Sequence, residues 1–150
     1  CQHRRVDEAL KAGGAAVGAK TVIETLPGMF PLACSPRLND LFVENIKEYF
    51  PETKIEDAGH FTASTDMGHI SHLMPSIHPF IGGVDGGLHT KDFCVTDFDA
   101  AAILPGKVFA MNIIDLLYDE AAMAKEILEK EKPILTKEEY LAKLESYFQS

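Results

Sequence analysis

The chain has 150 residues, of which 46% are apolar and 25% are charged. This is ordinary for a soluble globular protein, and the length suits about one domain with a single core. The apolar and charged composition excludes a disordered chain, and the 11 glycines, 8 prolines and 3 cysteines exclude collagen-like and disulfide-rich scaffolds. The net charge of −9 argues against a nucleic-acid partner, because the phosphates would be repelled.

The cysteines are few and widely spaced, at Cys1, Cys34 and Cys94. Such a set forms no disulfide framework and fits a reducing compartment, so we expect a cytoplasmic protein. The start at Cys1 fits a truncated chain, a processed N-terminal nucleophile or a lipidated cysteine. We favour truncation, because residues 2–18 have helical spacing from the outset and no turn or strand precedes them to present Cys1.

The first expected elements are a helix and a strand. Apolar residues at helical spacing predict a helix over residues 2–18, which ends at Gly18. The β-rich residues 20–26 predict a strand, which Pro27-Gly28 ends. A helix and a strand without a partner in this chain indicate that their sheet neighbours are missing.

An amphipathic helix is predicted over residues 36–50. Ser35 is a suitable N-cap, Pro36 suits the first helical position, and Pro51 stops the helix. The apolar face of this helix consists of Leu38, Leu41, Phe42, Ile46, Tyr49 and Phe50. Residues 54–57 and 76–81 predict short strands, the second of them buried.

The C-terminal third is predicted to be helical. Pro105 suits a first turn, and residues 108–118 are apolar nearly all round, which predicts a helix buried on most sides. Residues 119–132 become charged and amphipathic. Thr136 and Glu139 form a capping box ahead of a last helix, whose face is Tyr140, Leu141, Leu144, Tyr147 and Phe148. Helices alternating with short strands favour an α/β or α+β fold.

Histidines gather between residues 58 and 94, and we expect chemistry there. The segment holds His60, His69, His72, His78 and His89. Neutral imidazole is a common zinc ligand and titrates near neutral pH. His69 and His72 could share a helical face, but they lack the glutamate of a His-Glu-x-x-His site. The alternative for any single one is a hydrogen-bonded core or loop histidine.

Two stretches of this segment are candidate binding sites. Ser64-Thr65-Asp66 precede an expected helix start, where Asp66 would cap the helix and leave amides for an anionic group; an ordinary turn is the alternative. His89 follows a double-glycine loop on an exposed connection, where ligands and catalytic groups often lie, and the alternative is a surface histidine. Residues 67–84 carry no Asp, Glu, Lys or Arg, but their histidines, prolines and glycines exclude a lipid-facing helix, so no membrane partner is expected.

The same region resembles a known enzyme family. Its motifs are similar to the C-terminal part of the zinc amidohydrolases of metallopeptidase family twenty, which include aminoacylases, aminobenzoyl-glutamate hydrolases and related dipeptidases. The branch it most resembles is the aminoacylase-like, peptidase-domain-containing one. The motifs are Ser64-Thr65-Asp66-Met67-Gly68, Ser71-His72, Pro75-Ser76-Ile77-His78-Pro79 and Gly87-Leu88-His89-Thr90, followed by an Ala- and Leu-rich helix. The likeness is strongest over residues 62–118 and is fairly specific as a combined pattern.

The resemblance implies a two-domain parent enzyme. Its catalytic domain would be a helix-flanked α/β sheet, and a smaller α+β lid domain would make a homo-oligomer. Residues 1–28 would close the lid, and residues 29–150 would form the C-terminal segment of the catalytic domain. The parent would cleave the amide bond of an N-acyl amino acid or a dipeptide through a metal-activated water.

The resemblance also assigns roles to residues. Of the family's zinc ligands, only the late histidine maps onto this chain, at His89. The general base belongs to a Glu-Glu pair ahead of the lid, and Glu138-Glu139 is not its counterpart. Because one imidazole is one of the three or four protein ligands that zinc needs, this chain alone should bind zinc weakly and be inactive.

The substrate loop is matched by Ser64, Thr65 and Asp66. Ala63-Ser64 stand where the family often has glycines ahead of Thr-Asp. Two other functions remain open. One is a non-catalytic module that self-associates through the exposed lid helix and strand edge. The other is an N-terminal-nucleophile hydrolase that uses Cys1.

Overall fold

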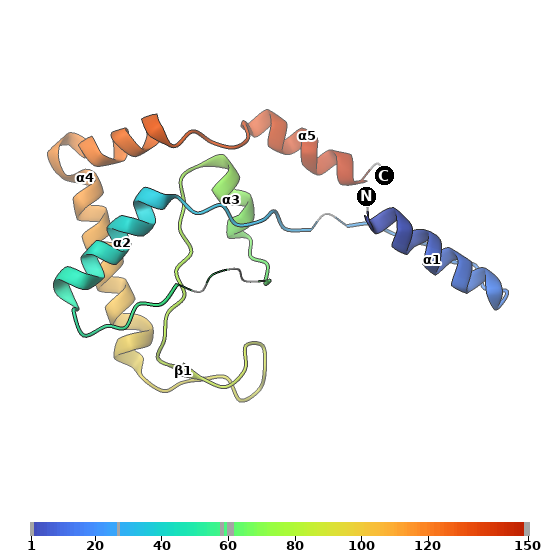
Figure 1. Ribbon diagram of the computed structural model, residues 1–150, viewed down its shortest axis with the longest axis horizontal. Coiled ribbons are helices and arrows are strands. Elements are labelled where there is room, and N and C mark those ends of the chain that lie inside the picture. Colours follow the sequence, from blue (N-terminus) through green and yellow to red (C-terminus); the bar gives the residue numbers. More distant parts are fainter. Residues whose placement is uncertain (1, 27, 58, 60–61, 149–150) are drawn as a thin grey trace. The chain divides into compact units, whose positions relative to one another are not determined.

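The computed structural model describes residues 2–26, 28–57, 59 and 62–148. The chain is a mixed helix and strand protein, mostly helical (56%), with a small two-stranded sheet (Figure 1). It divides into two compact units, Cys1–Gly28 with Glu138–Ser150 and Met29–Lys137. The lid and catalytic assignments predicted for residues 1–28 and 29–150 stay predictions, and residues 138–150 group with the N-terminal segment.

The first unit is built from α1 (Gln2–Ala16) and most of α5 (Lys137–Phe148). α1 forms as predicted, and Gly18 follows its end with φ +72°, which glycine adopts without strain. The strand predicted at residues 20–26 is wrong, because the described residues there are irregular and Val22 is 78% exposed. A strand needs a partner for its backbone groups, and no described segment pairs with this run. α5 begins directly after Thr136, where the sequence predicted a helix start.

The helix α2 (Pro36–Tyr49) opens the second unit and forms as predicted. Ser35 Oγ accepts a hydrogen bond from Leu38 N at 3.1 Å, so Ser35 is the N-cap that the sequence indicated. The predicted apolar face is buried at Leu41, Phe42 and Ile46, but Tyr49 at its end is 57% exposed.

The middle of the second unit is mostly irregular. α3 (Met67–Leu73) is a short helix, and the strands predicted at residues 54–57 and 76–81 are wrong, because the described chain forms no strand there. The sheet consists instead of β1 (Val84–Asp85) and β2 (Cys94–Val95), antiparallel with Val84 opposite Val95. These two strands hold the two ends of the loop that carries His89.

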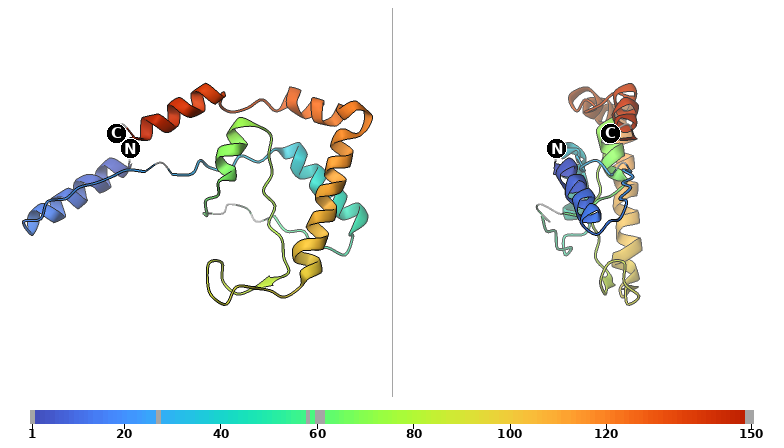
Figure 2. Two further views of the ribbon diagram at one scale, coloured as in Figure 1. Left: turned by 180° about the vertical axis from the view of Figure 1, so that it is seen from behind. Right: turned by 90° about the vertical axis from the view of Figure 1, so that its right-hand side faces the viewer.

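A long helix follows, and it is broken in the middle. The π-helix η1 (Asp99–Ile103) leads into α4 (Leu104–Lys130). At Asp119, Glu120 and Ala121 the φ angles are positive, at 48°, 53° and 61°, so α4 consists of two arms that run in different directions (Figures 1 and 2). The break lies where the sequence changes from apolar to charged.

The core of the second unit lies between α2 and the first arm of α4. Phe42, Ile46 and Val108 form its centre, and Val108 is 0% exposed. A polar contact lies in the same interface. Asn45 Nδ2 donates to Asn112 Oδ1 and to Asp115 Oδ2, both at 2.8 Å, and Asn45 and Asn112 are buried. This one amide therefore uses both of its hydrogens to join the two helices.

The burial predicted for residues 108–118 on most sides is wrong. In the first arm of α4 the buried row runs through Pro105, Val108 and Asn112. On the other side, Ile114 and Tyr118 are 64% and 78% exposed. α2 covers one face of the helix, and no described element covers the opposite face.

Asp99–Lys130 is long and apolar enough to cross a membrane by length and composition. It is the one such helix in the described part of the chain, and 17% of its most apolar window is buried. This is weak evidence for a membrane span, because the core helices of soluble proteins pass the same test. The cytoplasmic location therefore stays a prediction.

Replacing Asn45 by Ala is expected to lower the free energy of unfolding by about 2–3 kcal/mol, because it leaves Asn112 Oδ1 and the Asp115 carboxylate without their donor. Urea unfolding followed by circular dichroism measures the loss. Asn39→Ala, on an exposed position of the same helix, is the control and should change stability by less than about 0.5 kcal/mol. Equal losses in the two variants would contradict the role of the Asn45 contact.

Candidate functional site

The residues that the sequence singled out lie in two places of the second unit. Ser64, Thr65 and Asp66 precede α3, and His89 lies in the loop between β1 and β2. Among the described residues, no hydrogen bond or ion pair joins these two places. The substrate-binding and metal-binding roles of these residues stay predictions.

The turn before α3 is closed by backbone hydrogen bonds. Gly68 N donates to Thr65 O at 2.9 Å, His69 N donates to Asp66 O at 3.0 Å, and Met67 N donates to Thr65 Oγ1 at 3.3 Å. The amides that were expected to meet an anionic group therefore already have acceptors within the chain.

The expectation that Asp66 caps α3 is wrong. Its backbone is helical, with φ −57° and ψ −25°, and its side chain makes no capping hydrogen bond. A capping side chain reaches the first amides of a helix from extended backbone, which Asp66 does not have. The carboxylate is exposed, as is Ser64, whereas Thr65 is half-buried.

One face of α3 packs closely against Phe30. A Cβ atom at Gly68 would overlap the carbonyl oxygen of Phe30, so only glycine fits there. The buried Phe30 ring lies 4.9 Å from the His69 ring and 5.1 Å from the His72 ring, measured between centroids. His69 and His72 therefore share one face of α3, as predicted, and this face packs against the Phe30 ring.

His72 has a structural role in α3. Its Nδ1 lies 2.8 Å from Gly68 O, and because a carbonyl oxygen can only accept, Nδ1 carries the proton. The carbonyl of His72 accepts from Leu135 N at 3.0 Å. His72 thus joins α3 to the chain that follows α4, a role that spacing in sequence could not show.

Two serines of the motifs hold the segment ahead of α2. Ser71 Oγ accepts from Ala33 N at 3.1 Å and donates to Gly68 O at 2.9 Å. Ser76 O accepts from Ser35 N at 2.8 Å, and both Ser71 and Ser76 are buried. The Gly68-x-x-Ser71 spacing, one helical turn, was the sequence signal for this anchor, and sequence reasoning missed it.

His78 is half-buried without an assigned role. Its Nδ1 is buried and has no hydrogen-bond partner in the part of the chain that the structure describes. Its ring lies 5.7 Å from the Phe80 ring, edge to face. The match of His78 to the family pattern therefore still has no chemical explanation.

His89 occupies an exposed and strained position. Its φ of 62° is left-handed, which costs a residue with a Cβ atom about 1–2 kcal/mol. The loop around it is held by Thr90, whose N and Oγ1 donate to Gly87 O at 3.1 and 2.7 Å. Gly86 has φ +86° and allows no Cβ, because the Asp92 carbonyl oxygen would lie 2.5 Å from it. The expectation of an exposed histidine on a loop is confirmed.

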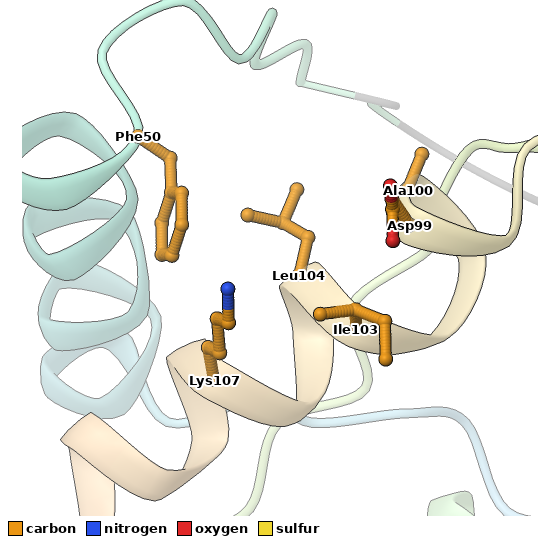
Figure 3. Close-up of a pocket in the computed structure, with 6 residues that line it drawn as sticks. All are labelled: Phe50, Asp99, Ala100, Ile103, Leu104 and Lys107. Carbon is orange, nitrogen blue, oxygen red and sulfur yellow. The ribbon is translucent and has the colours of Figure 1, made fainter.

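Two pockets lie elsewhere in the second unit. The larger, about 380 Å³, is lined by Phe50, Asp99, Ala100, Ile103, Leu104 and Lys107, and the Lys107 side chain extends toward Phe50 and Leu104 (Figure 3). A smaller one of about 160 Å³ lies between residues 33–36, α3 and residues 131–134. Neither pocket is lined by Ser64, Thr65, Asp66 or His89.

No three His, Cys, Asp or Glu side chains of the described residues lie close enough together to hold a metal ion. Cys34 is half-buried and Cys94 is exposed, both as free thiols. Cys1 and His60 lie outside the described residues. The exposed imidazole of His89 fits a zinc site as one ligand among several.

No protein-family model, curated protein or solved structure matches this chain. The likeness to zinc amidohydrolases therefore rests on the sequence motifs alone.

Replacing Gly68 by Ala is expected to destabilise the protein by more than about 2 kcal/mol, because the new methyl group collides with rigid backbone. Gly106→Ala is the control, since a Cβ there meets open space within a helix; stability should stay equal or rise by up to about 1 kcal/mol. Thermal unfolding compares the two variants. If both behave alike, the close contact between α3 and Phe30 is absent in solution.

Proposed function

We propose that this chain is the C-terminal portion of a zinc-dependent amidohydrolase that cleaves the amide bond of N-acyl amino acids or dipeptides. One observation carries the proposal. Of the described histidines in the motif segment, the rings of His69 and His72 pack on Phe30, and His78 is half-buried. His89, which the resemblance assigns to the metal, is the exposed one.

In this proposal the chain supplies part of an active site. Zinc, when bound, would activate a water molecule and polarise the scissile carbonyl. His89 would be one of the zinc ligands, and the other ligands and the glutamate base would come from polypeptide outside this sequence. The exposed side chains of Ser64 and Asp66, with the half-buried Thr65 between them, would contact the substrate.

The proposal includes the domain assignment. Residues 29–150 would belong to an α/β catalytic domain, and residues 1–28 would be the closing segment of a lid that forms a homo-oligomer. The enzyme would be cytoplasmic.

Metal binding by the chain itself tests the role of His89. Titration with Co²⁺, followed by its visible spectrum, should show weak binding, because a single imidazole is incomplete as a site. His89→Gln should weaken that binding at least tenfold, and His3→Gln, an exposed histidine of α1, should leave it unchanged. Binding that survives His89→Gln would reject His89 as the metal ligand.

The coding region immediately upstream tests the larger assignment. It is expected to encode a Cys-x-His or His-x-Asp element and a Glu-Glu pair, which would complete the ligands and supply the base. The chain alone should hydrolyse no N-acetyl amino acid above the uncatalysed rate. Hydrolysis at a rate typical of whole enzymes, or an upstream region without these elements, would overturn the proposal.

A further inference from the structure

The break in the middle of α4 is a strained piece of backbone. Three consecutive residues, Asp119, Glu120 and Ala121, have φ angles of 48°, 53° and 61°, and none of them is glycine. Left-handed backbone brings Cβ close to the following carbonyl oxygen, so residues other than glycine adopt it singly rather than in runs. The break is therefore a conformation that costs free energy at three neighbouring positions.

The sequence around the break gives no local reason for it. Sharp kinks in helices almost always lie at proline, at glycine, at a π-bulge or at an inserted side chain or water. Residues 117–123 contain neither proline nor glycine, and their Leu, Glu, Ala and Met residues are strong helix formers. By local preference alone, α4 would continue through the break as one helix. Contacts elsewhere must therefore hold the bent form.

Contacts between the second arm of α4 and the start of α2 hold the bend. Glu131 Oε1 accepts a hydrogen bond from Arg37 N at 3.2 Å. Arg37 N is among the first amides of α2, which have no acceptor within their own helix, and the helix dipole favours a carboxylate there. Arg37 Nη2 also donates to Met123 Sδ at 3.9 Å, and Ile127 on the same arm is buried.

We define the strap as residues 131–135, which continue from the second arm of α4 (Figure 1). Leu135 N donates to His72 O at 3.0 Å, so the strap is held at both of its ends. Its residues 131–134 line the pocket of about 160 Å³ together with Cys34, whose thiol is half-buried. That volume is below the roughly 300–1,000 Å³ of pockets that enclose a small molecule. The strap therefore forms one wall of a narrow space around this thiol.

We propose that the break in α4 is a hinge and the strap a cover over Cys34, which together exchange between a closed and an open form. In the closed form, the contacts of Glu131 and Leu135 outweigh the strain at residues 119–121. In the open form these contacts separate, the break regains helical backbone, and the strap moves away from Cys34. The strain favours opening, because it is released when the contacts are lost. The exchange needs neither metal nor substrate, so it does not rest on the proposed function.

Two neighbouring glycine substitutions test the hinge. Ala121→Gly removes strain from the closed form, so it should raise Tm by about 2–4 °C. Ala122→Gly is the matched control, since Ala122 is exposed and has helical backbone, and it should lower Tm by about the same amount. If Ala121→Gly lowers Tm as Ala122→Gly does, position 121 is ordinary helix and the hinge is overturned.

The rate at which dithiobis-nitrobenzoate modifies Cys34 measures opening, in a chain whose other two cysteines are replaced by Ser. Glu131→Ala should raise this rate at least about fivefold, because Arg37 N loses its acceptor. Ala121→Gly should lower it, because glycine favours the left-handed backbone of the closed form. Glu129→Ala, at an exposed position of the same arm, is the control and should leave the rate unchanged.

Asn45→Ala distinguishes opening of the strap from unfolding. It weakens the interface between α2 and the first arm of α4 without touching the strap, so it should lower Tm and leave the rate of Cys34 modification unchanged. Equal acceleration by Asn45→Ala and Glu131→Ala would show that the reagent reaches Cys34 through unfolding of the whole unit, which would overturn the strap. A rate that Glu131→Ala does not change would overturn it as well.

Spin labels measure the geometry of opening in a chain whose native cysteines are replaced by Ser. Lys107→Cys and Lys125→Cys place one label at an exposed position of each arm of α4. A continuous helix separates the two Cα atoms by about 27 Å, and the bent form brings them closer. Glu131→Ala should increase the population at the longer distance, and Ala121→Gly should decrease it. A distance distribution that is the same in both variants would overturn the exchange.

Discussion

The side-chain amide of Asn45 determines how the second unit is assembled. Its two hydrogens meet Asn112 Oδ1 and Asp115 Oδ2 in the interface between α2 and α4. The apolar contacts around it, at Phe42, Ile46 and Val108, would tolerate sliding of one helix along the other. The amide does not, because a shift would leave buried polar atoms without partners, at about 1–3 kcal/mol each. The same register decides which face of the first arm of α4 is buried and which face stays exposed.

The motif segment has two physically different parts. The first part has a structural role and consists of Gly68, Ser71 and His72. These residues bring α3 against Phe30 and join it to the chain on either side. Ser64 and His89, in contrast, are exposed, and their side chains make no hydrogen bond to a described residue. In the proposed function, the first group positions the turn before α3 that carries Ser64. A substitution at Gly68 or Ser71 would then lower activity through misplacement of the turn before α3, without contact with substrate.

Helices were predictable and strands were not, for a reason that particular residues show. Ser35 and Pro36 begin α2 through contacts within one turn, and Gly18 follows the end of α1 through its own backbone freedom. Residues 20–26 and 76–81 have β-forming composition, but a strand also needs a neighbour, and the described chain offers Ser76 a single backbone hydrogen bond from Ser35.

The sequence by itself determined the helices, the change from apolar to charged residues after Tyr118, the exposed loop of His89 and the motifs that resemble an amidohydrolase. All of these depend on residues a few positions apart. Tertiary structure alone decided that His69 and His72 pack on Phe30, that Asn45 meets Asn112 and Asp115, and that the apolar face of α4 opposite α2 stays uncovered. These contacts join residues far apart in the chain, and their partners follow from the packing of whole helices, which no local pattern encodes.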